Sequence, residues 1–216
     1  MIVTIYESND LMGAAAANDL AEILNKAIAE HAKAAVILAT GNSQLSFMRA
    51  LRSKPGISWD KITLFHMDEY LGMSDVHPAS FRHYIREHLD DIVHPHMFYG
   101  IQGDAPDIEA EMARYAALLD EHQPVACVLG FGENGHLAFN DPPADLSTKK
   151  TIHVVTLAQT ARLQQVGEGH FAKLAAVPQQ AVSLTVPALI RPDYVLAVVP
   201  ETRKAQAVKD ALEGPI

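Results

Sequence analysis

Three short parts of the chain carry side chains that could move protons or hold an anion. A glycine-rich segment brings Asn134, His136 and Asp141 close together in the sequence. Imidazole titrates near neutral pH, and polar neighbours can orient it, so this group suits general acid–base chemistry. A further carboxylate, Asp68, closely follows an apolar run, and a small polar turn occupies residues 40–43. Together these parts predict a proton-transfer site, whereas the glycine-rich segment alone would also fit a loop with a surface histidine.

The small polar turn lies between a predicted strand at 34–38 and a predicted helix at 45–51. In that arrangement the free backbone N–H groups and the helix dipole favour an anion such as phosphate. Such turns are more often simple helix caps, so the turn by itself is a weak indication of a phosphate site. The residues of the turn are Thr40, Gly41, Asn42 and Ser43.

Predicted strands position all three parts. The apolar runs 34–38, 62–66 and 125–129 each end just before one of them. Continuous apolar runs are typical of parallel strands that are covered on both faces. Ligands of open α/β sheets bind at the carboxyl ends of the strands, so we expect the three parts to meet at one edge of the sheet.

The rest of the chain alternates between strand and helix patterns. This alternation predicts an α/β fold with three layers, in which helices cover both faces of a mostly parallel, Rossmann-like sheet. No linker, repeat or low-complexity tract interrupts residues 1–216, so a single domain is expected. The further strands are predicted at 1–6, 151–155, 181–186 and 194–199, and the further helices at 9–33, 81–89, 107–119, 158–166 and 202–212.

Composition excludes several classes of protein. The net charge of −9 argues against a nucleic-acid binder, and no apolar run has the length of a membrane span. A single cysteine, Cys127, predicts a reducing, cytoplasmic setting without an internal disulfide. The 11 histidines are scattered without the spacing of metal ligands, so no metal site is predicted.

These parts of the chain resemble the glucosamine-6-phosphate deaminase (isomerase) family. The likeness extends to segments 202–205 and 212–214 and so spans nearly the whole chain. The sister family, 6-phosphogluconolactonase, shares the fold, but its glycine–histidine turn resembles Asp-Gly-His-x-Ala-Ser-Leu-Phe-Pro. Residues 138–140, Ala-Phe-Asn, therefore favour the deaminase. The segments that carry the resemblance are 40–43, 65–70, 77–80 and 130–142.

The resemblance implies isomerisation and deamination of an aminosugar phosphate, with no metal or organic cofactor. Glucosamine 6-phosphate and water would give fructose 6-phosphate and ammonia. His136 matches the family residue that opens the sugar ring, and Asn134 and Asp141 match the residues that orient it. Asp68 matches the base that takes the proton from C2 of the open sugar.

The resemblance also implies a phosphate site. Lys204 matches the family's phosphate-contacting lysine, and the turn at 40–43 would cradle the phosphate. A further arginine is expected after the strand at 151–155, and Arg162 is the nearest one. Lys204 would otherwise be an ordinary exposed lysine.

Some features depart from the family pattern. Asp141 replaces the usual glutamate, Asn134 stands where some relatives have aspartate, and Gln44 stands where the common Gly-Gly-Thr-Pro turn has proline. Relatives usually continue beyond Ile216, so the resemblance implies a C-terminal truncation that leaves part of a sheet edge or face uncovered.

Two other functions stay open at this stage. A lactonase would need His136 to activate water but would not need Asp68 as a base toward carbon. A non-catalytic sugar-phosphate sensor would keep the phosphate turn, yet it would need neither Asp68 nor His136. The sequence leaves the aminosugar epimer undecided, and a homo-oligomer remains an open alternative to a monomer.

Overall fold

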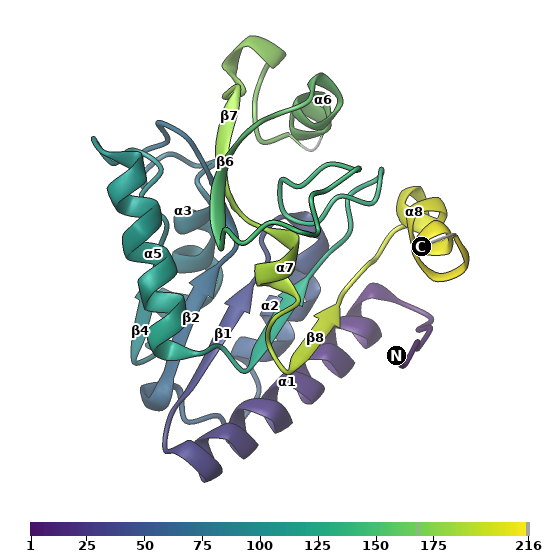
Figure 1. Ribbon diagram of the computed structural model, residues 1–216. Coiled ribbons are helices and arrows are strands. Elements are labelled where there is room, and N and C mark those ends of the chain that lie inside the picture. Colours follow the sequence, from purple (N-terminus) through teal and green to yellow (C-terminus); the bar gives the residue numbers. More distant parts are fainter. Residues whose placement is uncertain (168, 215–216) are drawn as a thin grey trace.

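A computed structural model describes residues 1–167 and 169–214, which contain a five-stranded parallel sheet in the order β4-β2-β1-β5-β8 (Figure 1). The three central strands are buried at every position, as their continuous apolar runs predict. The predicted α/β fold with a mostly parallel sheet is thus confirmed. The strands are β1 (Ala34–Leu38), β2 (Ile62–His66), β4 (Met97–Tyr99), β5 (Ala126–Leu129) and β8 (Tyr194–Ala197).

A smaller antiparallel sheet in the order β3-β7-β6 accompanies the parallel one. Its strands are β3 (Asp68–Tyr70), β6 (Ile152–Thr156) and β7 (Gln180–Leu184). β6 and β7 rise from the carboxyl-terminal side of the parallel sheet toward α6 (Figure 1). The sequence patterns do not predict this second sheet, because β3 is too short to show a periodic pattern and pairs with a distant part of the chain.

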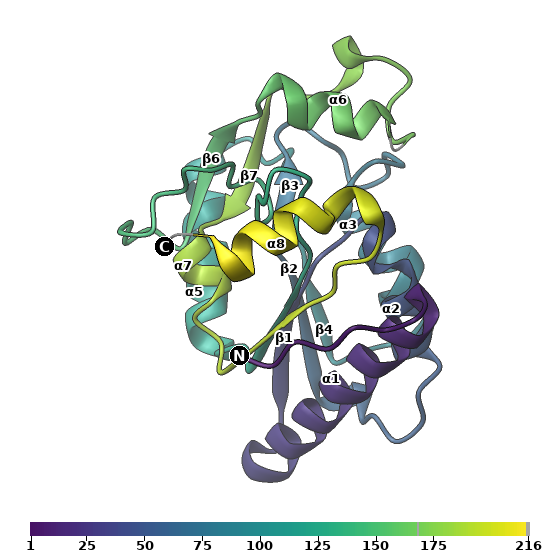
Figure 2. The same cartoon turned by 90° about the vertical axis from the view of Figure 1, so that its right-hand side faces the viewer.

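Helices cover both faces of the parallel sheet (Figure 2). α1 and α2 lie on one face and α5 lies on the other. Ser8 caps α1 by accepting a hydrogen bond from Leu11 N. The α-helices are α1 (Asn9–His31), α2 (Leu45–Arg52), α3 (Phe81–Ile85), α4 (Asp91–Val93), α5 (Ile108–His122), α6 (Gln159–Gly167), α7 (Val186–Leu189) and α8 (Ala205–Glu213). A π-helical turn spans Arg86–Asp90, and 3-10 turns span Asn42–Gln44, Trp59–Lys61, Leu174–Ala176 and Thr202–Lys204.

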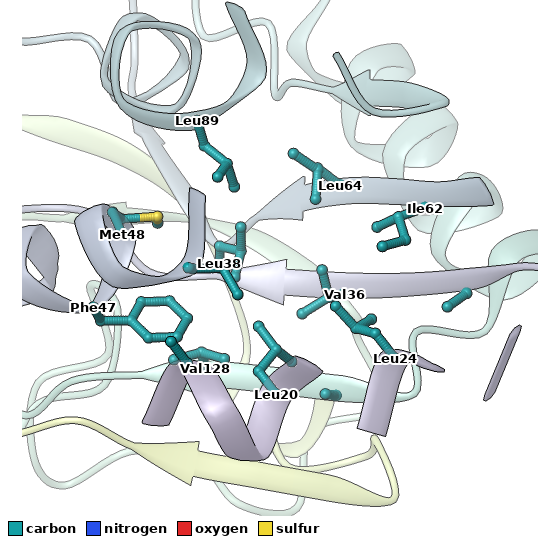
Figure 3. Packing of buried hydrophobic residues seen from close by; sticks show 14 of the residues in the cluster. Leu20, Leu24, Val36, Leu38, Phe47, Met48, Ile62, Leu64, Leu89 and Val128 are labelled. Carbon is teal, nitrogen blue, oxygen red and sulfur yellow. The ribbon is translucent and has the colours of Figure 1, made fainter. Parts of the chain in front are cut away.

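The alternation of side chains along β1 divides the core between the two faces. Val36 and Leu38 pack with α1 and α2, whereas Ala35 and Ile37 pack with α5. α1 approaches α2 closely at Gly13, where a β-carbon would lie 2.7 Å from Phe47 N. The first cluster contains, among others, Leu20, Leu24, Val36, Leu38, Phe47, Met48, Ile62, Leu64, Leu89 and Val128 (Figure 3).

One strand prediction was wrong. Residues 1–6 form no strand, and Ile2 and Ile5 are each 93% exposed. β-forming residues need a hydrogen-bonding neighbour to make a strand, and within the described residues this segment has none. β8 forms where expected but is exposed, because β5 is its only neighbouring strand within the described residues; Val195 is 43% exposed.

No helix in the described part of the chain is long and apolar enough to cross a membrane.

Candidate active site

The parallel sheet brings the three chemical segments to one cavity. β1, β2 and β5 all point their carboxyl ends toward it, as parallel strands must. The buried Asp68 belongs to the second sheet, which starts two residues after β2 ends. The predicted site residues that line the cavity are Thr40, Gly41, Asn42, Ser43, Asp68, His136 and Lys204.

An amide connects the histidine to a carboxylate. Oδ1 of Asn134 lies 2.7 Å from Nδ1 of His136, and Nδ2 of Asn134 donates to Oδ1 of Asp141 at 2.9 Å. The direct distance from Nδ1 of His136 to Oδ1 of Asp141 is 3.6 Å, too long for a good hydrogen bond. The Asp141 carboxylate therefore connects to the His136 ring through the Asn134 amide.

This geometry fixes the tautomer of His136. The amide cannot be turned around, because its oxygen also accepts the backbone N–H of His136 at 3.2 Å and its NH2 group faces a carboxylate. An amide oxygen can only accept, so Nδ1 of the neutral ring must carry the proton. Nε2 is then the ring nitrogen that carries the lone pair, so it is the atom of His136 that can act as a base.

Gly132 leaves room for the imidazole ring of His136. A β-carbon at Gly132 would overlap the ring atoms of His136, so only glycine leaves room for the imidazole there. The backbone also holds the turn closed, since Gly132 N donates to His136 O at 2.9 Å and Gly135 N donates to Gly132 O at 3.1 Å.

Asp68 is a buried carboxylate, 6% exposed, that faces the cavity. Burial, with a smaller contribution from the neighbouring Glu69, raises the pKa of Asp68 to about 8. Within the described residues no hydrogen-bond donor reaches its side chain, which leaves the carboxylate available to a substrate. Its strand, β3, is held by antiparallel pairing with β7, where Asp68 lies opposite Ser183.

The adjacent Glu69 has a different, structural role. Its carboxylate accepts the Ser80 hydroxyl at 2.7 Å and the backbone N–H groups of Phe81 and Arg82 at 3.2 and 3.0 Å. These groups form the first turn of α3, so Glu69 caps that helix. Of the two adjacent acids, Glu69 therefore caps a helix, whereas Asp68 faces the cavity.

The turn after β1 has the backbone expected of an anion cradle. Gly41 adopts φ +93°, in the region that favours glycine, and the 3-10 turn Asn42–Gln44 then leads into α2. The carbonyl of Gly41 accepts the Tyr84 hydroxyl at 2.9 Å and Gln44 N at 3.0 Å. Both bonds hold the turn at the entrance of a helix, where backbone N–H groups favour an anion.

Lys204 enters the cavity from the 3-10 turn that precedes α8. It is only 5% exposed, so it is not the ordinary surface lysine that the sequence left as an alternative. An ammonium group held at this position favours a negative charge in the cavity.

Arg162 does not line the cavity, and its assignment to the phosphate has no structural support. Its guanidinium donates to the carbonyl oxygens of Leu174 and Val177, each at 2.9 Å. Arg162 therefore ties α6 to the segment before β7. The prediction rested on closeness in sequence to β6, which does not fix where the side chain points.

Other residues reach the cavity that the sequence analysis did not assign to it. Gln165 is one of them, and its Oε1 accepts the hydroxyl of Tyr70 at 2.9 Å; Tyr70 itself is buried beside Phe81 and Phe139 and is not a lining residue. α6 and the segment after it carry polar groups to the cavity, and no motif in the sequence marks them. The additional lining residues include Phe81, Phe131, Phe139, Gln164, Gln165 and His170. The described residues contain no cluster of three or more His, Cys, Asp or Glu side chains arranged to hold a metal.

Comparisons with known proteins identify the family of the chain. A family model described as glucosamine-6-phosphate isomerases/6-phosphogluconolactonase matches residues 7–215. The chain is 34% identical over 200 residues to the glucosamine-6-phosphate deaminase of Exiguobacterium sibiricum, covering 92% of this chain and 77% of that protein. It is 31% identical over 195 residues to the deaminase of Streptococcus sanguinis, covering 90% and 80%.

Solved structures show the same relationship. A monomeric glucosamine-6-phosphate deaminase superposes with a TM-score of 0.91 at 28% identity, covering 100% of this chain and 89% of that chain. A 6-phosphogluconolactonase from Shewanella baltica gives a TM-score of 0.78 at 20% identity, covering 96% and 84%, and so shares the fold.

Proposed function

Because the chain belongs to the glucosamine-6-phosphate isomerase/6-phosphogluconolactonase family, we propose that it is a glucosamine-6-phosphate deaminase. It converts glucosamine 6-phosphate and water into fructose 6-phosphate and ammonia. The observation that carries this proposal is the shared cavity, which both the buried Asp68 carboxylate and the His136 ring line. The reaction needs one group to open the sugar ring and a second to take a proton from carbon, and this cavity supplies both.

Binding begins with the phosphate. The backbone N–H groups of the 40–43 turn and the ammonium of Lys204 hold its oxygens, which fixes the sugar with its reacting carbons between His136 and Asp68.

Ring opening is the task of His136. Nε2 accepts the proton of the O1 hydroxyl and the imidazolium returns a proton to the ring oxygen, so the C1–O5 bond breaks and an aldehyde forms. During the transfer, Nδ1–H stays on the Asn134 amide, and the Asp141 carboxylate behind it stabilises the imidazolium.

Asp68 carries out the step at carbon. It removes the C2 proton of the open aminoaldose, and the electron pair forms a C1–C2 enolamine as O1 gains a proton. Reprotonation at C1 gives an iminium at C2; water adds there, and cleavage of the C2–N bond releases ammonia and leaves the ketose. A carboxylate with its pKa raised to about 8 is a stronger base than an exposed aspartate, which suits a weakly acidic C–H bond.

The structure also bears on the lactonase alternative. Asn140 is buried and donates Nδ2 to the carbonyls of Leu137 and Leu184, each at 2.8 Å, while Oδ1 lies 3.0 Å from Nε2 of His153. Asn140, the last residue of the Ala-Phe-Asn segment that favours the deaminase over the lactonase, therefore fixes the loop between His136 and Asp141. A lactone hydrolysis has no use for Asp68 as a base toward carbon, so the buried free carboxylate favours the deaminase.

The test is an assay of both products from glucosamine 6-phosphate. The unaltered protein should release ammonia and fructose 6-phosphate in equal amounts, and Asp68→Asn should lose this activity while it keeps its fold. Release of 6-phosphogluconate from its lactone without deamination would establish a lactonase. Tight binding of the sugar phosphate without any product would establish a sensor.

For the cellular setting, we propose the cytoplasm. Cys127, the only one in the sequence, is buried within β5, and burial raises the pKa of its thiol to about 12. Such a thiol is unreactive, and its reduced state fits a cytoplasmic enzyme.

A further inference from the structure

Gln44 is a fully buried polar side chain at the junction of three loops of the site. Its Nε2 donates to Oγ of Ser43 at 3.1 Å and to the carbonyl of Val198 at 3.3 Å. A β-carbon at Gly130 would lie only 3.0 Å from the same nitrogen. One amide group therefore touches the loops that follow β1, β5 and β8.

The first contact determines what the Ser43 hydroxyl can do. A hydroxyl carries one proton, and here its oxygen accepts from the amide. Among the described residues the Ser43 hydroxyl donates to no acceptor, and the side chain lines the cavity. Its proton is thus available to an oxygen of a bound anion.

The second contact determines the position of the lysine. Val198 follows β8 directly, and the chain runs from it into the 3-10 turn Thr202–Lys204. By holding the carbonyl of Val198, Gln44 ties this segment to the turn at 40–43. The hydroxyl of Ser43 and the ammonium of Lys204, which enter the cavity from separate segments, are connected in this way through one side chain.

This arrangement leaves the other polar atom of the Gln44 amide in an unfavourable environment. Oε1 of Gln44 is buried, and among the described residues it accepts no hydrogen bond. An unsatisfied buried acceptor destabilises the fold. An apolar side chain of similar size would avoid that penalty, so folding alone does not explain a glutamine here.

We infer that Gln44 is a positioning residue for the phosphate subsite: it orients the Ser43 hydroxyl toward the phosphate and fixes its spacing to Lys204. The identity of the phosphorylated substrate rests on the proposed function. The geometry of the anion subsite does not, so inorganic phosphate serves as the probe.

The experiment compares unaltered protein with Gln44→Met, which keeps the length of the side chain and removes both donors. Calorimetric titration with inorganic phosphate should give a dissociation constant raised about tenfold. KM for glucosamine 6-phosphate should rise by a similar factor, with a much smaller change in kcat. Gln102→Met, at an exposed position outside the cavity, is the control and should change neither quantity.

A double variant separates positioning from general damage. In a Ser43→Ala background, Gln44→Met should weaken phosphate binding by less than it does alone, because the hydroxyl that it orients is gone. Equal effects in both backgrounds would overturn the inference, as would unchanged phosphate affinity in folded Gln44→Met or no phosphate binding by the unaltered protein. Weaker phosphate binding in a chain that fails to deaminate would refute the proposed function and support the role of Gln44.

Discussion

The amide oxygen of Asn134 lies 2.7 Å from Nδ1 of His136, and the amide nitrogen faces the carboxylate of Asp141. A neutral side chain therefore separates the imidazole from its charge partner. The amide supplies direction, because it accepts from Nδ1 and leaves Nε2 unprotonated. The Asp141 carboxylate supplies the negative charge, but it lies behind the amide and not directly against the imidazole ring.

Replacing Asn134 tests whether the tautomer matters. Asn134→Leu removes the acceptor for Nδ1–H, so a large share of the rings should hold the proton on Nε2, where it blocks base action. We expect kcat to fall by about 10²-fold or more, with little change in KM. Asn134→Asp keeps an acceptor at the same place and should retain most of the activity. Equal activity of the leucine and aspartate variants would contradict the assigned tautomer.

Gly132→Ala should displace the imidazole without touching the phosphate subsite. The added methyl group would occupy the space of the His136 ring, so kcat should fall by at least about tenfold while inorganic phosphate binds as before. Gly135→Ala is the matched control: its φ of +84° makes alanine strained by about 1–2 kcal/mol, but no atom lies within 4 Å of the new β-carbon. This variant should lower Tm, whereas its loss of kcat should be smaller than that of Gly132→Ala. If both variants lose kcat equally, loop strain rather than ring displacement is the cause.

Lys204→Met should weaken binding more than chemistry. In the proposed function the ammonium group binds the phosphate, which does not react, so KM should rise about 10- to 100-fold and kcat should change little. Lys209→Met removes an exposed lysine from α8, in the same part of the chain, and should leave both constants unchanged. A fall in kcat at unchanged KM would place Lys204 at the reacting carbons instead.

The parts of this site that follow long apolar runs can be predicted from the sequence, whereas those that depend on long-range strand pairing cannot. Apolar runs identified β1, β2 and β5, and because parallel strands end at one edge, the convergence of Asp68 and His136 could be predicted from their places after those strands. The second sheet could not be predicted, since β3 has three residues and its partner strand lies far along the chain. The residues on α6 reach the cavity through that sheet, so no local pattern marks them.

The errors have a common physical origin. Residues 1–6 have the composition of a strand but no partner among the described residues, and Arg162 has the right charge but bonds to two backbone carbonyls. In both cases the residue type was compatible with the prediction and the tertiary contacts decided otherwise. The unpaired Oε1 of Gln44 and the order of atoms around Asn134 likewise depend on distances that a sequence does not contain.

The raised pKa of Asp68 predicts the pH dependence of catalysis. The base must be ionised, so kcat/KM should rise with pH through an apparent pKa near 8. Asp68→Asn should be slower by about 10²- to 10⁴-fold and should lack this limb of the profile. A rate constant that stays flat between about pH 7 and 9 in the unaltered protein would contradict a base of this pKa.

The same carboxyl group should make stability depend on pH in a defined direction. Its pKa is about 8 in the folded protein and near 3.8 in the unfolded chain, so between these values the folded state binds more protons. The free energy of unfolding should therefore decrease as pH rises from about 4 to about 8, and remain level above that range as far as this group is concerned.

Asp68→Asn removes the titrating group without changing its shape. The Tm of the variant minus that of the unaltered protein should increase by a few degrees between about pH 5 and 9 in calorimetric scans. Asp193→Asn, at a position outside this cavity, controls for the loss of one negative charge and should show no such trend. A difference in Tm that is the same at both ends of the range would show that Asp68 ionises at the pH of an ordinary aspartate, and the base proposed for C2 would then lack its matched pKa.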